Sequence, residues 1–156
     1  MKKFIVIPDS YKGTLSSENI CEIMAEAIWT RFPEAQVITL PVADGGEGTV
    51  AAFLQAVGGK RVEARVTGPL GENVSAFYGL LPDGTAVIEM ATAAGLPLVG
   101  EKLLVGQTTT YGVGELIAHA ISQGAKKILL GLGGSATNDG GCGAAAALTA
   151  NRLWVK

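Results

Sequence analysis

The sequence is poor in charge, in cysteine and in histidine, and each shortage excludes a class of function. Charged residues make up 17% of the 156 residues, and the net charge is −2. Binding to DNA, RNA or an acidic lipid surface needs clustered lysine and arginine, which this composition does not favour. The cysteines, Cys21 and Cys142, both fall in expected helices, so we expect no stapling disulfide. His119 is the single histidine and lies on an expected solvated helix face, so we expect no catalytic role for it.

Long hydrophobic runs are also missing. The N-terminal stretch MKKFIVIPDS holds only a short apolar run before Asp9, too short for the apolar part of a signal peptide. No uncharged apolar run approaches the roughly 20 residues that a transmembrane helix needs. Together with reduced cysteines, these absences predict a soluble, cytoplasmic protein without a membrane partner.

Apolar residues and glycine dominate what the sequence does contain, at 48% hydrophobic residues and 22 glycines. The length suffices for one domain of ordinary size with a hydrophobic core. A short apolar run at residues 4–7 predicts a parallel strand buried on both faces, and a second strand is expected at residues 37–42. A helix is expected from the N-cap Ser16 until Pro33, and another at residues 49–57. Such alternation of strand and helix is typical of a parallel sheet.

The pattern changes at residues 61–91, where helix caps are absent and alternating residues predict an antiparallel hairpin or meander. Beyond this segment we expect a helix at residues 113–123, a buried strand at 127–132, a glycine loop and a last helix. The sequence therefore predicts an α/β fold, a Rossmann-like parallel sheet flanked by helices with an antiparallel insertion. Residues 1–60 and 92–156 would form an incomplete parallel core. The antiparallel segment would belong to this core or to a second domain.

Three of the four aspartates directly follow the three expected parallel strands. These are Asp9, Asp44 and Asp139, whereas Asp83 lies in the hairpin turn. Because the carboxyl ends of parallel strands meet at one edge of a sheet, we expect the three carboxylates to gather there with Lys12. Glycine-rich loops would let backbone amides approach a phosphate, and the positive end of the following helix would add to the attraction. The pattern favours a phosphorylated ligand with a metal ion.

Each feature also has a purely structural interpretation. Glycines occur in tight connections without a ligand, Lys12 could be a solvated charge, and Asp44 could only cap a helix through its capping-box spacing to Glu47. Residues 131–136 match the dinucleotide fingerprint G-x-G-x-x-A, which leaves a nicotinamide-dependent oxidoreductase as an alternative. This match is weak because the motif normally follows the first strand of the sheet, whereas here it follows a late one. The sequence also offers no acidic residue about 20 residues further on to bind the ribose. The sequence contains no G-x-x-x-x-G-K-[ST] motif, which excludes an ordinary P-loop protein.

Five ordered motifs resemble those of the bacterial glycerate kinases, the family that forms 2-phosphoglycerate in glyoxylate and sugar-acid catabolism. They cover nearly the whole chain, from about Lys3 to Leu148. The motifs are PDSYKGTLSS (8–17), PVADGGEGT (41–49), IEMATAAGL (88–96), TTYGVGELI (109–117) and GLGGSATNDGGCG (131–143), and VTGPLGE (66–72) is similar as well.

The resemblance implies ATP- and Mg²⁺-dependent transfer of a phosphoryl group to a hydroxyl of D-glycerate. It also implies a two-domain α/β architecture with the active site in a cleft. Phosphoryl transfer needs positioning, charge neutralisation and orientation of the attacking hydroxyl. Under this resemblance Lys12 would neutralise phosphate or the substrate carboxylate. Asp44 and Asp139 would serve as general base and metal ligand, in either order.

Further expected site residues lie in the same loops and would bind phosphate or glycerate through backbone and side-chain groups. They are Asp9, Ser10, Gly45, Gly46, Gly133, Gly134, Ser135, Thr137 and Asn138. The expected partners are small molecules, D-glycerate and ATP, without nucleic acid or membrane, and a homo-oligomer is left open.

The sequence departs from this family at its end. Family members are longer and carry further glycine-rich and acidic motifs, whereas this sequence ends with ALTANRLWVK and departs from the pattern after Leu148. An incomplete reading frame would have this appearance. Two hypotheses follow, a glycerate kinase represented by its N-terminal part, or a non-catalytic fragment that binds anions or associates with itself.

Overall fold

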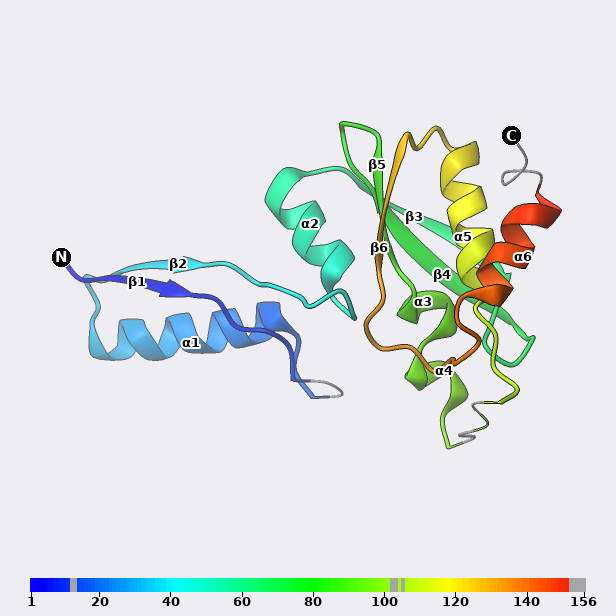
Figure 1. Ribbon diagram of the computed structural model, residues 1–156. Helices are drawn as coiled ribbons and strands as arrows, with labels where there is room; N and C mark the ends of the chain where they lie inside the picture. The colour runs from blue at the N-terminus through cyan, green and yellow to red at the C-terminus, as the bar shows by residue number, and fades with distance from the viewer. Residues whose placement is uncertain (12–13, 102–103, 105, 152–156) are drawn as a thin grey trace. The chain divides into compact units, whose positions relative to one another are not determined.

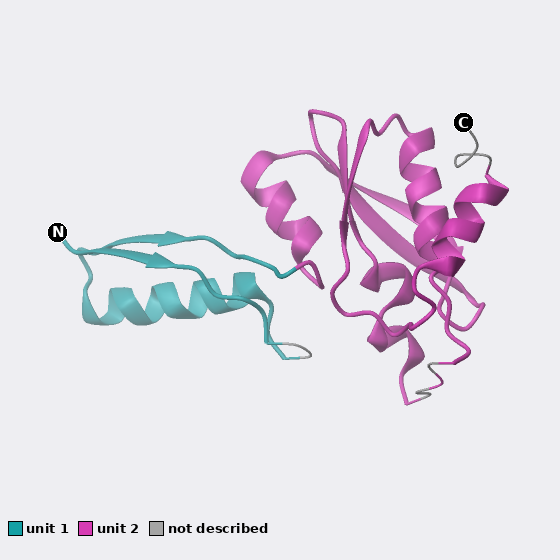
Figure 2. Ribbon diagram, viewed as in Figure 1, with its two compact units in different colours: residues 1–44 teal, residues 45–156 magenta. Residues whose placement is uncertain are grey.

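The computed structural model describes residues 1–11, 14–101, 104 and 106–151. The chain divides into two compact units, which we call unit 1 (residues 1–44) and unit 2 (residues 45–156) (Figure 2). Parallel and antiparallel strands flanked by helices confirm the expected α/β class. The expected antiparallel segment, residues 61–91, shares unit 2 with the residues that follow it.

Unit 1 is a βαβ unit in which two parallel strands are joined by one helix. The Ser16 hydroxyl accepts a hydrogen bond from the Asn19 amide at 3.2 Å, which confirms Ser16 as the N-cap. The helix ends at Arg31, before Pro33, as the sequence predicted. Its elements are β1 (Lys3–Val6), α1 (Ser17–Arg31) and β2 (Gln36–Thr39).

Strand β1 of unit 1 is not buried on both faces, contrary to the expectation from its apolar run. Val6 is buried together with Ile20, Cys21 and Ala25 of α1, whereas Ile5 on the opposite face of β1 is 59% exposed. Side chains alternate between the two faces of a strand, and within unit 1 α1 packs on one face. The apolar run alone therefore does not show whether other elements cover one face of the strand or both.

Unit 2 contains a mixed sheet with the strand order β3-β4-β5-β6 (Figure 1). The first three strands form the expected antiparallel meander, and β6 pairs in parallel with β5. The expected sheet with three parallel strands is therefore not formed by the described residues, because β6 joins the meander rather than β1 and β2. The strands are β3 (Lys60–Thr67), β4 (Asn73–Leu80), β5 (Thr85–Glu89) and β6 (Lys127–Gly131).

Helices cover both faces of this sheet (Figure 1). Val87 of β5 packs with Val50 of α2 on one face, while Ile88 packs with Tyr78 and Leu116 on the other. All five residues of β5 are buried, so this strand lies at the centre of the core. The helices are α2 (Thr49–Val57), α3 (Ala91–Ala94), α4 (Leu96–Val99), α5 (Tyr111–Ser122) and α6 (Cys142–Ala150).

Strand β6 is an edge strand, although its sequence predicts full burial. Leu129 is 39% exposed, and Leu132 just beyond the strand is 67% exposed. Ile128 and Leu130 pack against the core on the other face. In the part of the chain that the structure describes, β6 pairs with β5 alone, which leaves its second edge open. None of the described helices combines the length and the apolarity required to cross a lipid bilayer.

Truncation of a core leucine is expected to destabilise unit 2 strongly. Leu116→Ala removes a fully buried side chain of α5 and should lower the free energy of unfolding by about 2–5 kcal/mol. Leu132→Ala is the matched control, because the Leu132 side chain is largely exposed and its loss should cost under about 0.5 kcal/mol. Urea denaturation measures both variants, and equal losses would contradict the position of the core.

Candidate functional site

Two glycine-rich loops of unit 2 meet backbone to backbone. The first precedes α2 and contains Gly45 and Gly46, and the second follows β6. The Gly133 amide donates a hydrogen bond to the Gly45 carbonyl at 2.9 Å. A Cβ atom added to Gly133 would lie 2.6 Å from the Gly46 nitrogen, and one added to Gly131 would overlap the Gly45 carbonyl. The main chains approach this closely only because these positions lack side chains.

The N-terminus of α6 is closed by Asp139. Its Oδ2 atom accepts hydrogen bonds from the Thr110 amide and hydroxyl, both at 2.8 Å, and from the Gly143 amide at 3.1 Å. Its Oδ1 atom accepts one bond from the Gly141 amide at 3.1 Å. The Ala144 amide donates to the Thr110 hydroxyl at 3.0 Å. Asp139 thus joins the beginnings of α5 and α6.

These contacts set the ionisation of Asp139. Burial raises the pKa of this carboxyl, but the hydrogen bonds from Thr110, Gly141 and Gly143 outweigh burial and hold the pKa below its ordinary value. Asp139 is therefore an ionised, hydrogen-bonded carboxylate near neutral pH. Such a group is a weak proton acceptor but a suitable cation ligand.

The N-terminus of α2 is closed by a second carboxylate, Glu89 at the end of β5. Glu89 is 2% exposed, and its Oε1 atom accepts a hydrogen bond from the Val50 amide at 2.7 Å. Burial raises the pKa of Glu89, and the bond from Val50 opposes that rise. Glu89 was not among the site residues expected from the sequence, although an acidic residue within the apolar run TAVIEM was the available signal.

The expected capping box of Asp44 and Glu47 does not begin α2. The N-cap residue is Gly48, in a left-handed conformation with φ +93°, and no side chain of the cap residue bonds the helix. The helix ends that are expected to contribute to anion binding include Val50 of α2 and Gly143 and Ala144 of α6. Internal oxygen atoms already accept hydrogen bonds from these amides.

Donors for an anion remain within the second glycine loop. The Ser135 and Thr137 hydroxyls lie 2.9 Å apart, and the Thr137 amide donates to the Ser135 hydroxyl at 3.1 Å. The Gly134 carbonyl accepts from the Leu96 amide at 3.0 Å, which ties the loop to α4. Within the described ranges, the amides of Gly134 and Ser135 donate to no protein acceptor. Asn138 is exposed in the same loop.

The candidate residues of unit 1 lie in its two strand-following loops. Asp9 is exposed and its Oδ1 atom accepts a hydrogen bond from the Ser10 amide at 2.7 Å. Asp44 is exposed at the end of the unit. Lys12, the expected cation, lies outside the described residues. The structure thus brings together the candidates of unit 2, from Gly45 and Gly46 to the second glycine loop.

A metal site made only of protein ligands is not found in the described ranges, which contain no cluster of three His, Cys, Asp or Glu side chains suited to an ion. Mg²⁺ needs no such cluster, because one or two carboxylates together with phosphate oxygens and water commonly hold it. The Asp139 carboxylate fits this use, since its Oδ1 atom accepts a single hydrogen bond.

The dinucleotide fingerprint at residues 131–136 lacks its structural context. In that motif the glycine turn leads directly into a helix whose N-terminus faces the pyrophosphate. Here α6 begins only at Cys142, and its first turn is closed by Asp139. Residues 131 and 133 are glycines because the first loop packs against them. This geometry opposes the oxidoreductase alternative.

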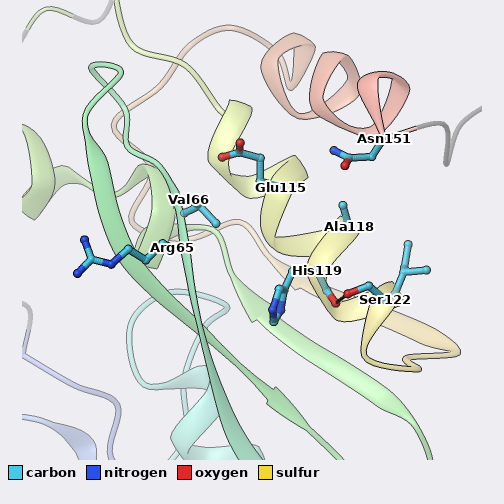
Figure 3. Close-up of a pocket in the computed structure, with 8 residues that line it drawn as sticks. Arg65, Val66, Glu115, Ala118, His119, Ser122 and Asn151 are labelled. Carbon is cyan, nitrogen blue, oxygen red and sulfur yellow. Dashed lines mark hydrogen bonds between the residues drawn. The ribbon is translucent and has the colours of Figure 1, made fainter.

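A pocket of about 450 Å³ lies elsewhere in unit 2, along α5 (Figure 3). None of the candidate site residues lines it. His119 borders this pocket and is half-buried, with its Nδ1 atom 3.2 Å from the hydroxyl of buried Tyr78. The expected solvated face for His119 is therefore wrong, because α5 packs on β4. The lining residues are Arg65, Val66, Glu115, Ala118, His119, Ile121, Ser122 and Asn151.

Comparison with known proteins gives a consistent result. Residues 4–154 match the model of the glycerate kinase family. The chain is 51% identical over 150 residues to glycerate 2-kinase of Escherichia coli, and 51% identical over 148 residues to glycerate kinase of Bacillus subtilis. These alignments cover 95% and 94% of the chain but 39% of each relative.

Among solved structures, a crystal structure assigned as a glycerate kinase 2 from Salmonella typhimurium matches with a TM-score of 0.76 and 47% identity. This match covers 94% of the chain and 40% of that protein. The chain therefore spans about 40% of the length of the relatives that it matches.

The contact between the loops predicts that Gly133 tolerates no side chain. Gly133→Ala would press a methyl group against the Gly46 backbone and should lower the free energy of unfolding by about 1–3 kcal/mol. Gly106→Ala is the control, because an added Cβ there meets no atom within 4 Å and the φ angle is ordinary. Thermal or urea unfolding compares the two variants, and equal stability would show that the loops are not in contact.

The lowered pKa of Asp139 predicts an acid-sensitive contribution to stability. A group with a lowered folded-state pKa stabilises the fold above its unfolded pKa, about 3.9 for aspartate, and this contribution disappears as the pH falls through the folded value. The stability difference between wild type and Asp139→Asn should therefore shrink between about pH 5 and about pH 2. Urea denaturation across this range tests it, and a constant difference would contradict the assignment.

Proposed function

The chain belongs to the glycerate kinase family, and from this premise we propose that it forms the N-terminal part of an enzyme that phosphorylates D-glycerate. The phosphoryl donor is ATP, and the product is 2-phosphoglycerate. The names of the E. coli and B. subtilis relatives support the substrate. The share of the relatives that the chain covers makes this a proposal about a part of the catalytic apparatus.

The backbone contact between the two glycine loops is the observation that carries the proposal. It holds Gly45 and Gly46 against Gly131 and Gly133 and leaves the Gly134 and Ser135 amides without a protein acceptor among the described residues. Backbone amides with small neighbouring side chains suit phosphate oxygens, which need donors at short range. Phosphoryl transfer depends mainly on positioning and charge stabilisation, so a rigid loop with available donors is an appropriate element.

The individual residues take the following roles in this proposal. The Gly133 and Gly134 segment and the hydroxyls of Ser135 and Thr137 bind phosphate or glycerate oxygens. Asn138, Gly45, Gly46, Asp9 and Ser10 complete the binding loops, and Lys12 neutralises phosphate or the substrate carboxylate. These assignments rest on the motifs and on the geometry of the second loop.

In this proposal Asp139 is the metal ligand and Asp44 is the general base. Asp139 is held ionised by its hydrogen bonds and would be the carboxylate that holds Mg²⁺. A bound Mg²⁺ would supply charge neutralisation at the phosphate oxygens. Asp44, exposed in the ADGGEG loop, would be the general base that orients the substrate hydroxyl and accepts its proton.

A non-catalytic role is the second candidate. The open edge of β6, with Leu129 and Leu132 exposed, favours a chain that associates with further polypeptide, either a second copy or another part of a kinase. Such a chain would bind anions at the glycine loops without turnover.

Measurement of ADP release tests the proposal. The purified chain, given ATP, Mg²⁺ and D-glycerate, should release ADP only when glycerate is present. Lys12→Ala should reduce this turnover by about 10²–10³-fold, because a charge that neutralises phosphate is lost.

Lys3→Ala is the matched control, since Lys3 begins β1 at the opposite end of the strand from the site loop and should leave turnover unchanged. A folded chain that binds ATP without releasing ADP would favour the non-catalytic role. Saturable NADH binding instead of ATP binding would overturn the proposal in favour of the oxidoreductase alternative.

A further inference from the structure

Glu89 is a buried acidic residue to which the proposed reaction assigns no part. Its side chain is 2% exposed at the end of the fully buried strand β5. A carboxylate in such a place loses hydration that only strong hydrogen bonds can replace. The hydrogen bond from the Val50 amide, at 2.7 Å, provides one such bond. This bond reaches an element 39 residues away in the sequence.

Glu89 contacts a segment next to each glycine loop, the first turn of α2 through its side chain and the end of β6 through its main chain. Val50 lies in the first turn of α2, directly after the first loop. In the ladder between β5 and β6, Glu89 is paired with Gly131, and the next amide, that of Met90, donates to the Gly131 carbonyl at 3.0 Å. Gly131 begins the second loop. One residue therefore connects the segments on either side of the contact between Gly133 and Gly45.

Helix α2 depends on this connection because it has no side-chain cap of its own. Its N-cap is Gly48 in a left-handed conformation, which provides no side-chain acceptor. A carboxylate at a helix N-terminus accepts from a free amide and interacts favourably with the helix dipole. If that acceptor were removed, the first turn of α2 would lose its hydrogen bond to β5 and keep only its apolar packing on that strand.

We propose that Glu89 is a positioning residue, whose carboxylate holds the first turn of α2 and thereby keeps the Gly45–Gly48 loop against the Gly131–Gly134 loop. The contact between the loops sets the placement of the Gly134 and Ser135 amides. Glu89 thus acts on the bound phosphate through these loops, without touching it. This step rests on the proposed function, whereas the coupling of the two loops can be measured without any substrate.

Amide hydrogen exchange in the full chain is the primary test. Glu89→Leu removes the acceptor and should speed exchange of the Val50 and Gly133 amides at least about tenfold more than exchange of the Leu116 amide in the core of α5. Glu89→Gln keeps an acceptor oxygen and should restore most of the protection. Should Glu89→Leu fail to fold, Glu89→Asp takes its place, because the shorter side chain weakens the reach to Val50.

Ile88→Val is the control, since it trims a buried side chain on the opposite face of the same strand. It should not speed exchange at Val50 or Gly133 more than at Leu116, against which Ile88 packs. Unchanged protection of Gly133 in Glu89→Leu, or in Glu89→Asp if that variant is used, would overturn the proposal. So would equal losses at Gly133 and Leu116, which indicate general destabilisation.

Kinetics separate this inference from the proposed function. In a chain with glycerate-dependent turnover, Glu89→Leu should raise the KM for ATP about tenfold or more, and Glu89→Gln should recover most of that loss. A wild type without turnover defeats the proposed activity, while the exchange result still decides whether Glu89 positions the loops. An unchanged KM for ATP in a turning-over Glu89→Leu protein would overturn its link to phosphate binding.

Discussion

The close approach of two main chains, at Gly45–Gly46 and Gly131–Gly133, is the constraint on which the candidate site depends. The Gly133 amide bonds the Gly45 carbonyl, and side chains at Gly131 or Gly133 would prevent that approach. The contact also joins the beginning of α2 to the end of β6, two segments far apart in the sequence. A rigid loop can present its amides in one arrangement, which is the condition for recognising a charged ligand without rearrangement cost.

Side-chain charge also determines what the N-termini of α2 and α6 can bind. Both helices that follow the glycine loops have carboxylates at their first turns, Glu89 for α2 and Asp139 for α6. These acids satisfy amides that would otherwise attract an anion, so the positive ends of these helices are partly neutralised from within the protein. Amides that have no protein acceptor within the described ranges lie instead in the loop between β6 and α6, beside the Ser135 and Thr137 hydroxyls.

The two acids differ in environment and hence in chemistry. Asp139 receives hydrogen bonds on both oxygens and stays ionised, whereas Glu89 is deeply buried and its pKa is raised. A carboxylate with a lowered pKa suits a cation, and a buried carboxylate with one strong bond suits a structural link. Family membership points to a kinase, and the roles proposed for these residues rest on their contacts. The open edge of β6 and the exposed Ile5 of β1 leave apolar surface that a longer polypeptide could cover.

Local patterns in the sequence determined much of the fold and the family. The structure confirms the helix boundaries at Ser16 and Pro33, the helix at residues 49–57 and the antiparallel meander. These features depend on short-range rules of capping, turn formation and alternation of side chains. The ordered motifs likewise identified the glycerate kinase family. Only the tertiary structure decided that β6 pairs with β5, that Glu89 bonds Val50 and that Gly131 and Gly133 face another backbone. Each of these features joins segments distant in the sequence, and a residue's neighbours along the chain carry no information about which distant surface will pack against it.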